Sequence, residues 1–123
     1  ENLRVIRTVR NSLVDGGTFV MDFLNASYLR THLVPESMTI LDGVTIMQDR
    51  WIEEPFVRKR ITINDPCCYE RTFEERVWLY GHNELLSMFA ENDLAVRHVF
   101  GDYDGSAFDE ATSQRCILIA EAR

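Results

Sequence analysis

An acidic stretch near the end of the chain carries carboxylates at a spacing that metal centres use. Asp102 and Asp104 lie in the segment Gly-Asp-Tyr-Asp-Gly-Ser, and Asp109 follows shortly after. Three carboxylates that converge can hold a divalent cation, and such a centre would support hydrolysis. Asp-x-Asp is also common in turns, where aspartate binds its own backbone. A metal-dependent hydrolase is therefore a minor hypothesis beside a turn role for Asp102.

Histidine is the other residue type that could act as a general base near neutral pH. His32 and His82 are candidates by type alone. His82 is better placed to begin a helix, His32 falls in a loop, and His98 lies within a predicted strand, packed or exposed. No catalytic base is assigned from the sequence.

The three cysteines do not form a pattern that binds metal or builds a disulfide framework. Cys67 and Cys68 are adjacent in a predicted turn, Cys116 lies in an apolar strand, and no Cys-x-x-Cys or paired-His spacing occurs. An odd count of this kind favours a reducing compartment, and we expect a cytoplasmic protein without a bound metal. Cys116 is expected to be a small core residue.

Composition indicates a globular domain without an affinity for polyanions. The 123 residues suit one domain, and 46% of them are apolar. Twenty acidic against thirteen basic side chains give a net charge of −7, with no basic stripe. This balance argues against nucleic acid or an anionic membrane as partner. No segment approaches the roughly 20 apolar residues that span a bilayer.

The elements that must position these residues begin with a helix and a strand. Apolar positions at helical spacing predict a helix over residues 2–14, and Gly16-Gly17 fit its C-cap and a tight turn. Thr18–Phe23 is apolar on both faces, which is typical of a central strand. The loop 25–36 contains one helical turn, Ala26–His32.

A run of alternating apolar and polar residues then predicts an antiparallel meander. One face of the strand 56–65 carries Val57, Lys59, Ile61 and Ile63, and the other carries Arg58, Arg60 and Thr62. A helix follows at Asn83–Asn92, capped by His82 or Asn83, with Asn92 in the left-handed conformation at its end. The remaining predicted strands are Ser37–Leu41, Gly43–Glu53, Phe56–Asp65, Tyr69–Tyr80, Ala95–Phe100 and Arg115–Glu121, with turns at Asp42-Gly43, Glu54-Pro55 and 65–68.

Three stretches of the sequence form a pattern that is known from one family. They are residues 13–25 with the Gly-Gly turn, residues 71–80 leading into 84–89, and residues 100–109 with 116–120. In this order and spacing they resemble the C-terminal half of class I S-adenosylmethionine-dependent methyltransferases. The most similar group is the small-molecule enzymes with a β-insertion after the fifth strand. One departure is Asp15, where the family usually has proline.

The resemblance implies an α/β fold for the complete domain. Within residues 1–123 alone, the class would be α+β. The fold comprises a partial Rossmann-like sheet of the family's strands five, six and seven, and an inserted meander over residues 37–80. Residues 1–123 would be the C-terminal part of one methyltransferase domain. The family order places strand Thr18–Phe23 beside Arg115–Glu121, which in turn lies beside Ala95–Phe100.

The resemblance also implies S-adenosylmethionine as cofactor, bound mainly by an N-terminal half. The family holds it with a Gly-x-Gly-x-Gly loop and an acidic residue after the second strand. None of the six glycines here forms such a loop. We therefore expect no cofactor-binding residue in this chain, little thermal shift on adding the cofactor, and an inactive fragment.

The implied acceptor is a small molecule, and eight residues are candidates to contact it. Each has a structural alternative: a helix cap for Asn25, a packed ring for Tyr28, cross-strand pairs in the meander, and a turn for the acidic loop. Arg71 would pair with a substrate carboxylate through its planar fork. The candidates are Asn25, Tyr28, Tyr69, Arg71, Trp78, Tyr80, Asp102 and Tyr103.

The missing neighbour of strand Thr18–Phe23 implies an exposed apolar edge. We expect self-association through it, as a homodimer or an aggregate. An alternative to the enzyme fragment is a non-catalytic binding or dimerisation module derived from the same fold. A glycine-rich loop encoded about one domain length upstream would favour the enzyme, and a start codon at Glu1 the module.

Overall fold

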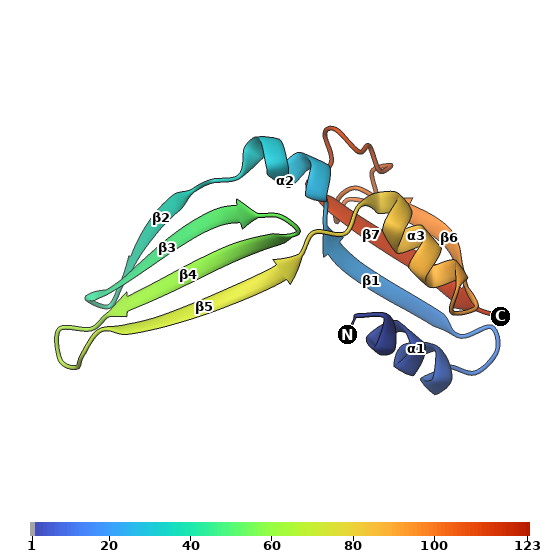
Figure 1. Cartoon of the computed structure of the whole chain (residues 1–123), viewed down its shortest axis with the longest axis horizontal. Helices are drawn as coiled ribbons and strands as arrows, with labels where there is room; N and C mark the ends of the chain where they lie inside the picture. The colour runs from blue at the N-terminus through green and yellow to red at the C-terminus, as the bar shows by residue number, and fades with distance from the viewer. Residues whose placement is uncertain (1) are drawn as a thin grey trace. The chain divides into compact units, whose positions relative to one another are not determined.

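The computed structural model describes residues 2–123. These residues form two compact units (Figure 1). Unit 1 comprises residues 2–29 and 80–123, so it is built from both ends of the chain. Unit 2 comprises Arg30–Leu79 and contains almost all of the predicted insertion 37–80. Tyr80, the last residue of that prediction, belongs to unit 1.

Unit 1 is built on a three-stranded sheet with the order β1-β7-β6. Both neighbouring pairs are antiparallel, so β1 and β6 run in the same direction. The strand order predicted from the methyltransferase resemblance is confirmed. The elements are α1 (Asn2–Ser12), β1 (Thr18–Leu24), α2 (Ala26–His32), α3 (His82–Ala90), β6 (Leu94–Phe100) and β7 (Arg115–Ala122), with α2 reaching into the first residues of unit 2.

One face of this sheet packs against α1 and α3. Alternation along β7 turns Cys116, Leu118, Ala120 and Ala122 to the core, where all four are buried. They meet Ile6 of α1 and the apolar side of α3. The core is completed by Leu85, Met88, Phe89 and Leu94, with Phe19, Met21 and Phe23 of β1 packed against it.

The Gly16-Gly17 pair makes a turn but does not cap α1. The helix ends at Ser12, before the glycines. Gly16 has φ +80°, which favours glycine, and its N–H donates to the carbonyl of Ala122 at 2.8 Å. The Gly17 carbonyl accepts from the N–H of Ala122 at 2.9 Å. The predicted C-cap is therefore wrong, and the glycines instead pair with the end of β7.

Both predicted ends of α3 also need correction. The N-cap is Gly81, whose N–H donates to the Glu84 carboxylate at 3.1 Å, so neither His82 nor Asn83 caps the helix. At the other end Asp93 has φ 55°, whereas Asn92 is buried and its amide donates to the Met88 carbonyl at 2.8 Å. The residue in the left-handed conformation after α3 is therefore Asp93, one position beyond the predicted Asn92.

Within the residues that the structure describes, β1 lies at an edge of the sheet, in agreement with the exposed edge that the sequence predicts for Thr18–Phe23. There β1 pairs with β7 alone and forms one edge of the sheet. Val20 on its outer face is 56% exposed, and the strand alternates between exposed and half-buried residues. Apolar residues on both faces of an edge strand are unusual in a finished sheet.

Unit 2 is a four-stranded antiparallel meander with the order β2-β3-β4-β5. Asp42-Gly43 forms the predicted turn between β2 and β3, and the structure gives both residues a positive φ. Glu54-Pro55 forms the next turn, and Asp65 accepts hydrogen bonds from the N–H groups of Cys67 and Cys68 at 3.0 Å each. The strands are β2 (Glu36–Leu41), β3 (Val44–Glu53), β4 (Phe56–Asn64) and β5 (Arg71–Trp78).

The sheet of unit 2 has two chemically different faces and no buried side chain. The register confirms that Val57, Lys59 and Ile61 share one face of β4 while Arg58 and Arg60 share the other. None of the residues in β2–β5 is fully buried, and β5 is exposed along its length. Within unit 2, the sheet is therefore a single layer that is not covered by a second one.

Over residues 2–123, no helix combines the length and apolar character needed to cross a bilayer.

Candidate functional site

The loops that follow the parallel strands β1 and β6 meet at one edge of the unit 1 sheet. Asn25 comes directly after β1, and Gly101 opens the loop after β6. Loops beyond the carboxyl ends of parallel strands are where α/β sheets bind ligands. Four candidates from the sequence are therefore on one side of this unit: Asn25, Tyr28, Asp102 and Tyr103.

Asn25 joins these two loops through hydrogen bonds of its side chain. It is 4% exposed, and its amide nitrogen donates to the carbonyls of Glu110 at 2.9 Å and Ser113 at 2.7 Å. Its backbone carbonyl accepts from Leu29 in the first turn of α2, but its side-chain amide is committed to the 110–113 loop. Asn25 is thus a positioning residue for the loop, while Tyr28 lies half-buried on α2.

Asp22, Tyr103 and Arg115 form a polar cluster, and Asp22 lies on the face of the same sheet that is opposite to the core residues of β7. The Tyr103 hydroxyl donates to Asp22 at 2.6 Å, and Nε of Arg115 lies 2.9 Å from the other carboxylate oxygen. The Arg115 guanidinium also lies 5.9 Å from the centre of the Tyr103 ring. Tyr103 is 73% exposed, so the cluster holds a large ring at the surface beside β1.

The electrostatics of this cluster follow from those contacts. Burial by itself would raise the pKa of Asp22, but the hydrogen bonds from Tyr103 and Arg115 and the charge of Arg115 outweigh it, so the pKa lies below its usual value. The hydrogen bond to Asp22 raises the pKa of Tyr103. Tyr103 therefore stays protonated at neutral pH and offers a hydroxyl, not a base.

The acidic loop uses its carboxylates to shape its own turns. Asp102 accepts from the N–H of Tyr103 at 2.7 Å, and Asp104 accepts from the N–H of Ser106 at 2.9 Å. Asp109 accepts from the N–H groups of Ala111 and Thr112 at 2.9 and 3.0 Å. Within residues 2–123, no group of three histidine, cysteine or acidic side chains is close enough to hold a metal ion. The hypothesis of an aspartate-bound metal has no support.

The remaining titratable candidates have structural partners. Nδ1 of His82 lies 3.8 Å from Sγ of Cys116, and its ring packs 4.6 Å from that of Phe108. Burial raises the pKa of Cys116 to about 11, so its thiol is not a nucleophile at neutral pH. His32 contacts the Thr31 hydroxyl, and His98 is exposed beside Phe100. All three cysteines are free thiols.

Tyr80 lines an open groove between α1 and α3. Its hydroxyl accepts a hydrogen bond from the Asn2 amide at 2.8 Å, and its ring lies 6.2 Å from Phe23. The groove has a volume of about 450 Å³, and its walls are Leu3, Tyr80, Asn83, Glu84, Ser87 and Met88.

The three candidates in unit 2 do not lie together. Trp78 pairs with Phe56, and Arg71 pairs with Ile63, so strand alternation places Trp78 and Arg71 on opposite faces of the sheet. Tyr69 is 76% exposed in the turn before β5. Within unit 2, Arg71 and Trp78 therefore do not share one face, and Tyr80, the fourth residue of the predicted wall, belongs to unit 1.

Sequence reasoning missed Asp22 and Arg115, which hold Tyr103. Asp22 is the one charged residue in an otherwise apolar strand, and that exception was the available signal. Arg115, at the start of an apolar strand, gave no such signal.

The residues that the structure describes do not build a cradle for a nucleotide-like cofactor. Gly16 and Gly17 belong to the α1–β1 turn, Gly43 to a hairpin, and Gly81 to the N-cap of α3. Gly101 and Gly105 belong to the loop after β6. Within residues 2–123, no Gly-x-Gly-x-Gly loop joins a strand to a helix.

Solved methyltransferase structures share this fold. The CcbJ methyltransferase of Streptomyces caelestis is 19% identical with a TM-score of 0.77, over 98% of this chain and 52% of its own. An S-adenosylmethionine-dependent methyltransferase of Clostridium acetobutylicum is 15% identical with a TM-score of 0.78, over 98% and 50%. The sugar N-methyltransferase KedS8 of Streptoalloteichus is 17% identical with a TM-score of 0.66, over 98% and 48%.

The chain therefore has the fold of about half of these methyltransferases and spans about half of their length. At these identities the likeness concerns the fold alone. No family model matches the sequence, and a comparison with curated proteins found no match.

Proposed function

We propose that residues 1–123 are the C-terminal half of an S-adenosylmethionine-dependent methyltransferase that acts on a small molecule. The observation that carries the proposal is the strand order β1-β7-β6, with one open edge, matched over 98% of the chain to half of several such enzymes. One of the similar structures, the sugar N-methyltransferase KedS8, supports a small-molecule acceptor. The free thiols favour a cytoplasmic location.

In this proposal unit 1 supplies the acceptor side of the site and no cofactor-binding residue. Tyr103, held by Asp22, presents its ring beside the loop that Asn25 fastens. Tyr28 and Asp102 flank them, and Tyr80 lines the groove of unit 1. Tyr69, Arg71 and Trp78 stay candidates for acceptor contact from unit 2. Much of the catalysis in methyl transfer is alignment of the acceptor atom with the methyl carbon, which rigid loops provide.

Binding of S-adenosylmethionine tests the proposal. We expect the complete gene product to take up the cofactor saturably in calorimetry, and residues 1–123 to show no uptake and little thermal shift. Failure of the complete gene product to bind would contradict the enzyme assignment. It would favour the alternative of a non-catalytic module.

We further propose that isolated residues 1–123 self-associate through the outer edge of β1. In the described residues this edge has no pairing strand, and it carries exposed Val20. Size-exclusion chromatography with light scattering is expected to show dimers or larger species. Val20→Lys should shift the population to monomer, because an edge lysine opposes strand pairing.

Val5→Lys is the matched control, because Val5 on α1 is 58% exposed and Val20 is 56% exposed. It should leave the self-association unchanged. A stable monomer of the unmodified chain at high concentration would count against edge pairing.

A further inference from the structure

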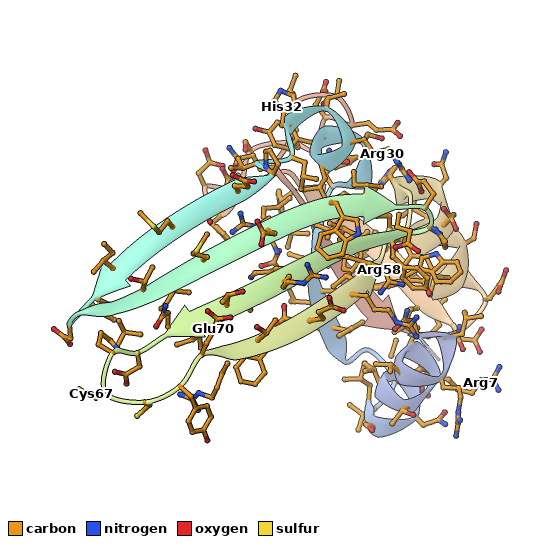
Figure 2. All side chains as sticks on the ribbon, turned by 60° about the vertical axis from the view of Figure 1, so that its left-hand side comes forward. Arg7, Arg30, His32, Arg58, Cys67 and Glu70 are labelled. Atoms are coloured by element: carbon orange, nitrogen blue, oxygen red, sulfur yellow. The ribbon has the colours of Figure 1, made fainter. Side chains whose placement is uncertain are left out.

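One face of the unit 2 sheet gathers aromatic rings and arginines at the end where β4 begins and β5 ends. Cross-strand neighbours Trp51 and Arg58, Arg58 and Arg76, and Phe56 and Trp78 all lie on this face. In Figure 2, Arg58 lies toward the end of the sheet opposite the Cys67 turn. We call this surface the aromatic–arginine face; its residues are Trp51, Phe56, Arg58, Arg60, Arg76 and Trp78.

The rings and guanidinium groups of this face are in direct contact. The Phe56 and Trp78 rings pack edge to face with centres 5.1 Å apart. The Arg76 guanidinium lies 4.8 Å from the Phe56 centre, and that of Arg60 lies 5.4 Å from the Trp51 centre. Rings that hold guanidinium groups in this way restrict their orientation, so the N–H donors are partly pre-organised.

Two of the three arginines have acidic partners, and one does not. Nε of Arg58 lies 2.9 Å from Glu53, and Arg60 donates twice to one oxygen of Glu74, at 3.0 and 2.8 Å. Within residues 2–123, no carboxylate lies within ion-pair distance of Arg76, although the chain carries a net charge of −7. Arg76 is exposed and cross-strand to Arg58, so a second positive charge lies beside it.

We propose that the aromatic–arginine face binds a planar aromatic ligand that carries a carboxylate or phosphate group. The oxyanion accepts from the planar fork of Arg76, and the ligand ring packs on Trp78, which is 39% exposed. Arg71 does not contribute to this site, since it lies on the opposite face of the sheet from Trp78. This binding requires no methyl donor and does not depend on the proposed methyl transfer.

Intrinsic fluorescence measures this binding selectively. The chain has two tryptophans, Trp51 and Trp78, and both belong to the aromatic–arginine face. We expect benzoate, phenyl phosphate or both to change the emission saturably, with at least about tenfold weaker binding for neutral benzyl alcohol. Tighter binding of benzoate would identify the oxyanion as a carboxylate, and tighter binding of phenyl phosphate would identify it as a phosphate.

Variants of Arg76 separate a specific site from general attraction. Arg76→Gln should weaken binding of the anionic probes about tenfold, and Arg76→Lys should restore it only in part, because lysine lacks the planar fork. Lys59→Gln is the matched control, since it removes one positive charge from the opposite face of the same sheet. It should leave the affinity unchanged.

Equal affinity for benzyl alcohol and the anionic probes would overturn the proposal. So would equal effects of Arg76→Gln and Lys59→Gln, or no fluorescence change with any probe. Because no cofactor is added, failure here leaves the methyltransferase assignment intact, and failure of cofactor uptake leaves this site intact.

Discussion

Replacement of Phe89 by alanine is expected to destabilise unit 1 by about 3–5 kcal/mol. Phe89 is fully buried at 0% exposure, and its ring stacks on Phe19 with centres 5.5 Å apart. It packs with Leu85 of α3 and Leu118 of β7, so its loss leaves a cavity where helix and sheet meet. Amide hydrogen exchange of β7 measures the effect, because these amides exchange only when unit 1 opens.

The matched control for this variant is Phe73→Ala in unit 2. Phe73 lies on β5 and is 50% exposed, so its truncation removes much less buried area. Exchange in β7 should be unchanged in this variant. Equal acceleration of β7 exchange by the two substitutions would contradict a core centred on Phe89.

Replacement of Gly101 by alanine is expected to cost unit 1 about 1–3 kcal/mol through overpacking. Gly101 is buried, and an added Cβ would overlap the hydroxyl of Ser113 and lie 2.8 Å from its Cβ and 3.2 Å from the carbonyl of Ala107. The Ser113 hydroxyl cannot move away freely, because it accepts from the N–H of Asp109 at 2.8 Å. Chemical denaturation measures the loss.

The double variant Gly101→Ala with Ser113→Gly provides the control. Removal of the Ser113 side chain should recover part of the loss, so the two effects should not add. Strictly additive losses would show that the cost of Gly101→Ala does not arise from contact with Ser113. Gly101→Ala alone should also loosen the loop that contains Tyr103, because the N–H of Gly101 donates to the carbonyl of Ser106 at 2.9 Å.

Much of the fold could be predicted from local patterns. Alternation assigned the faces of β4 correctly, because side chains on a strand alternate wherever it lies. The turn at Asp42-Gly43 could be predicted because aspartate and glycine tolerate the positive φ values that a two-residue hairpin turn requires. The strand order β1-β7-β6 came from the family resemblance, since periodicity alone does not say which strands pair.

The errors and omissions have a common physical origin in contacts between distant residues. Two hydrogen bonds join the Gly16-Gly17 turn to Ala122 at the far end of the chain, and local propensity, which does not include them, suggested a helix cap. Tyr103 is held by Asp22, which is 81 residues away in sequence. Arg76 was missed because its contact with the Phe56 ring joins two strands, and such a contact is not visible in the sequence.

Uptake of S-adenosylmethionine by residues 1–123 alone, measured by isothermal calorimetry beside the complete gene product, tests the central claim most directly. The described residues contribute the β1-β7-β6 half of a sheet and no glycine-rich cradle. We therefore expect no saturable heat from residues 1–123 and tight binding by the complete gene product. Tight, saturable binding by residues 1–123 alone would contradict the claim that this half does not hold the methyl donor.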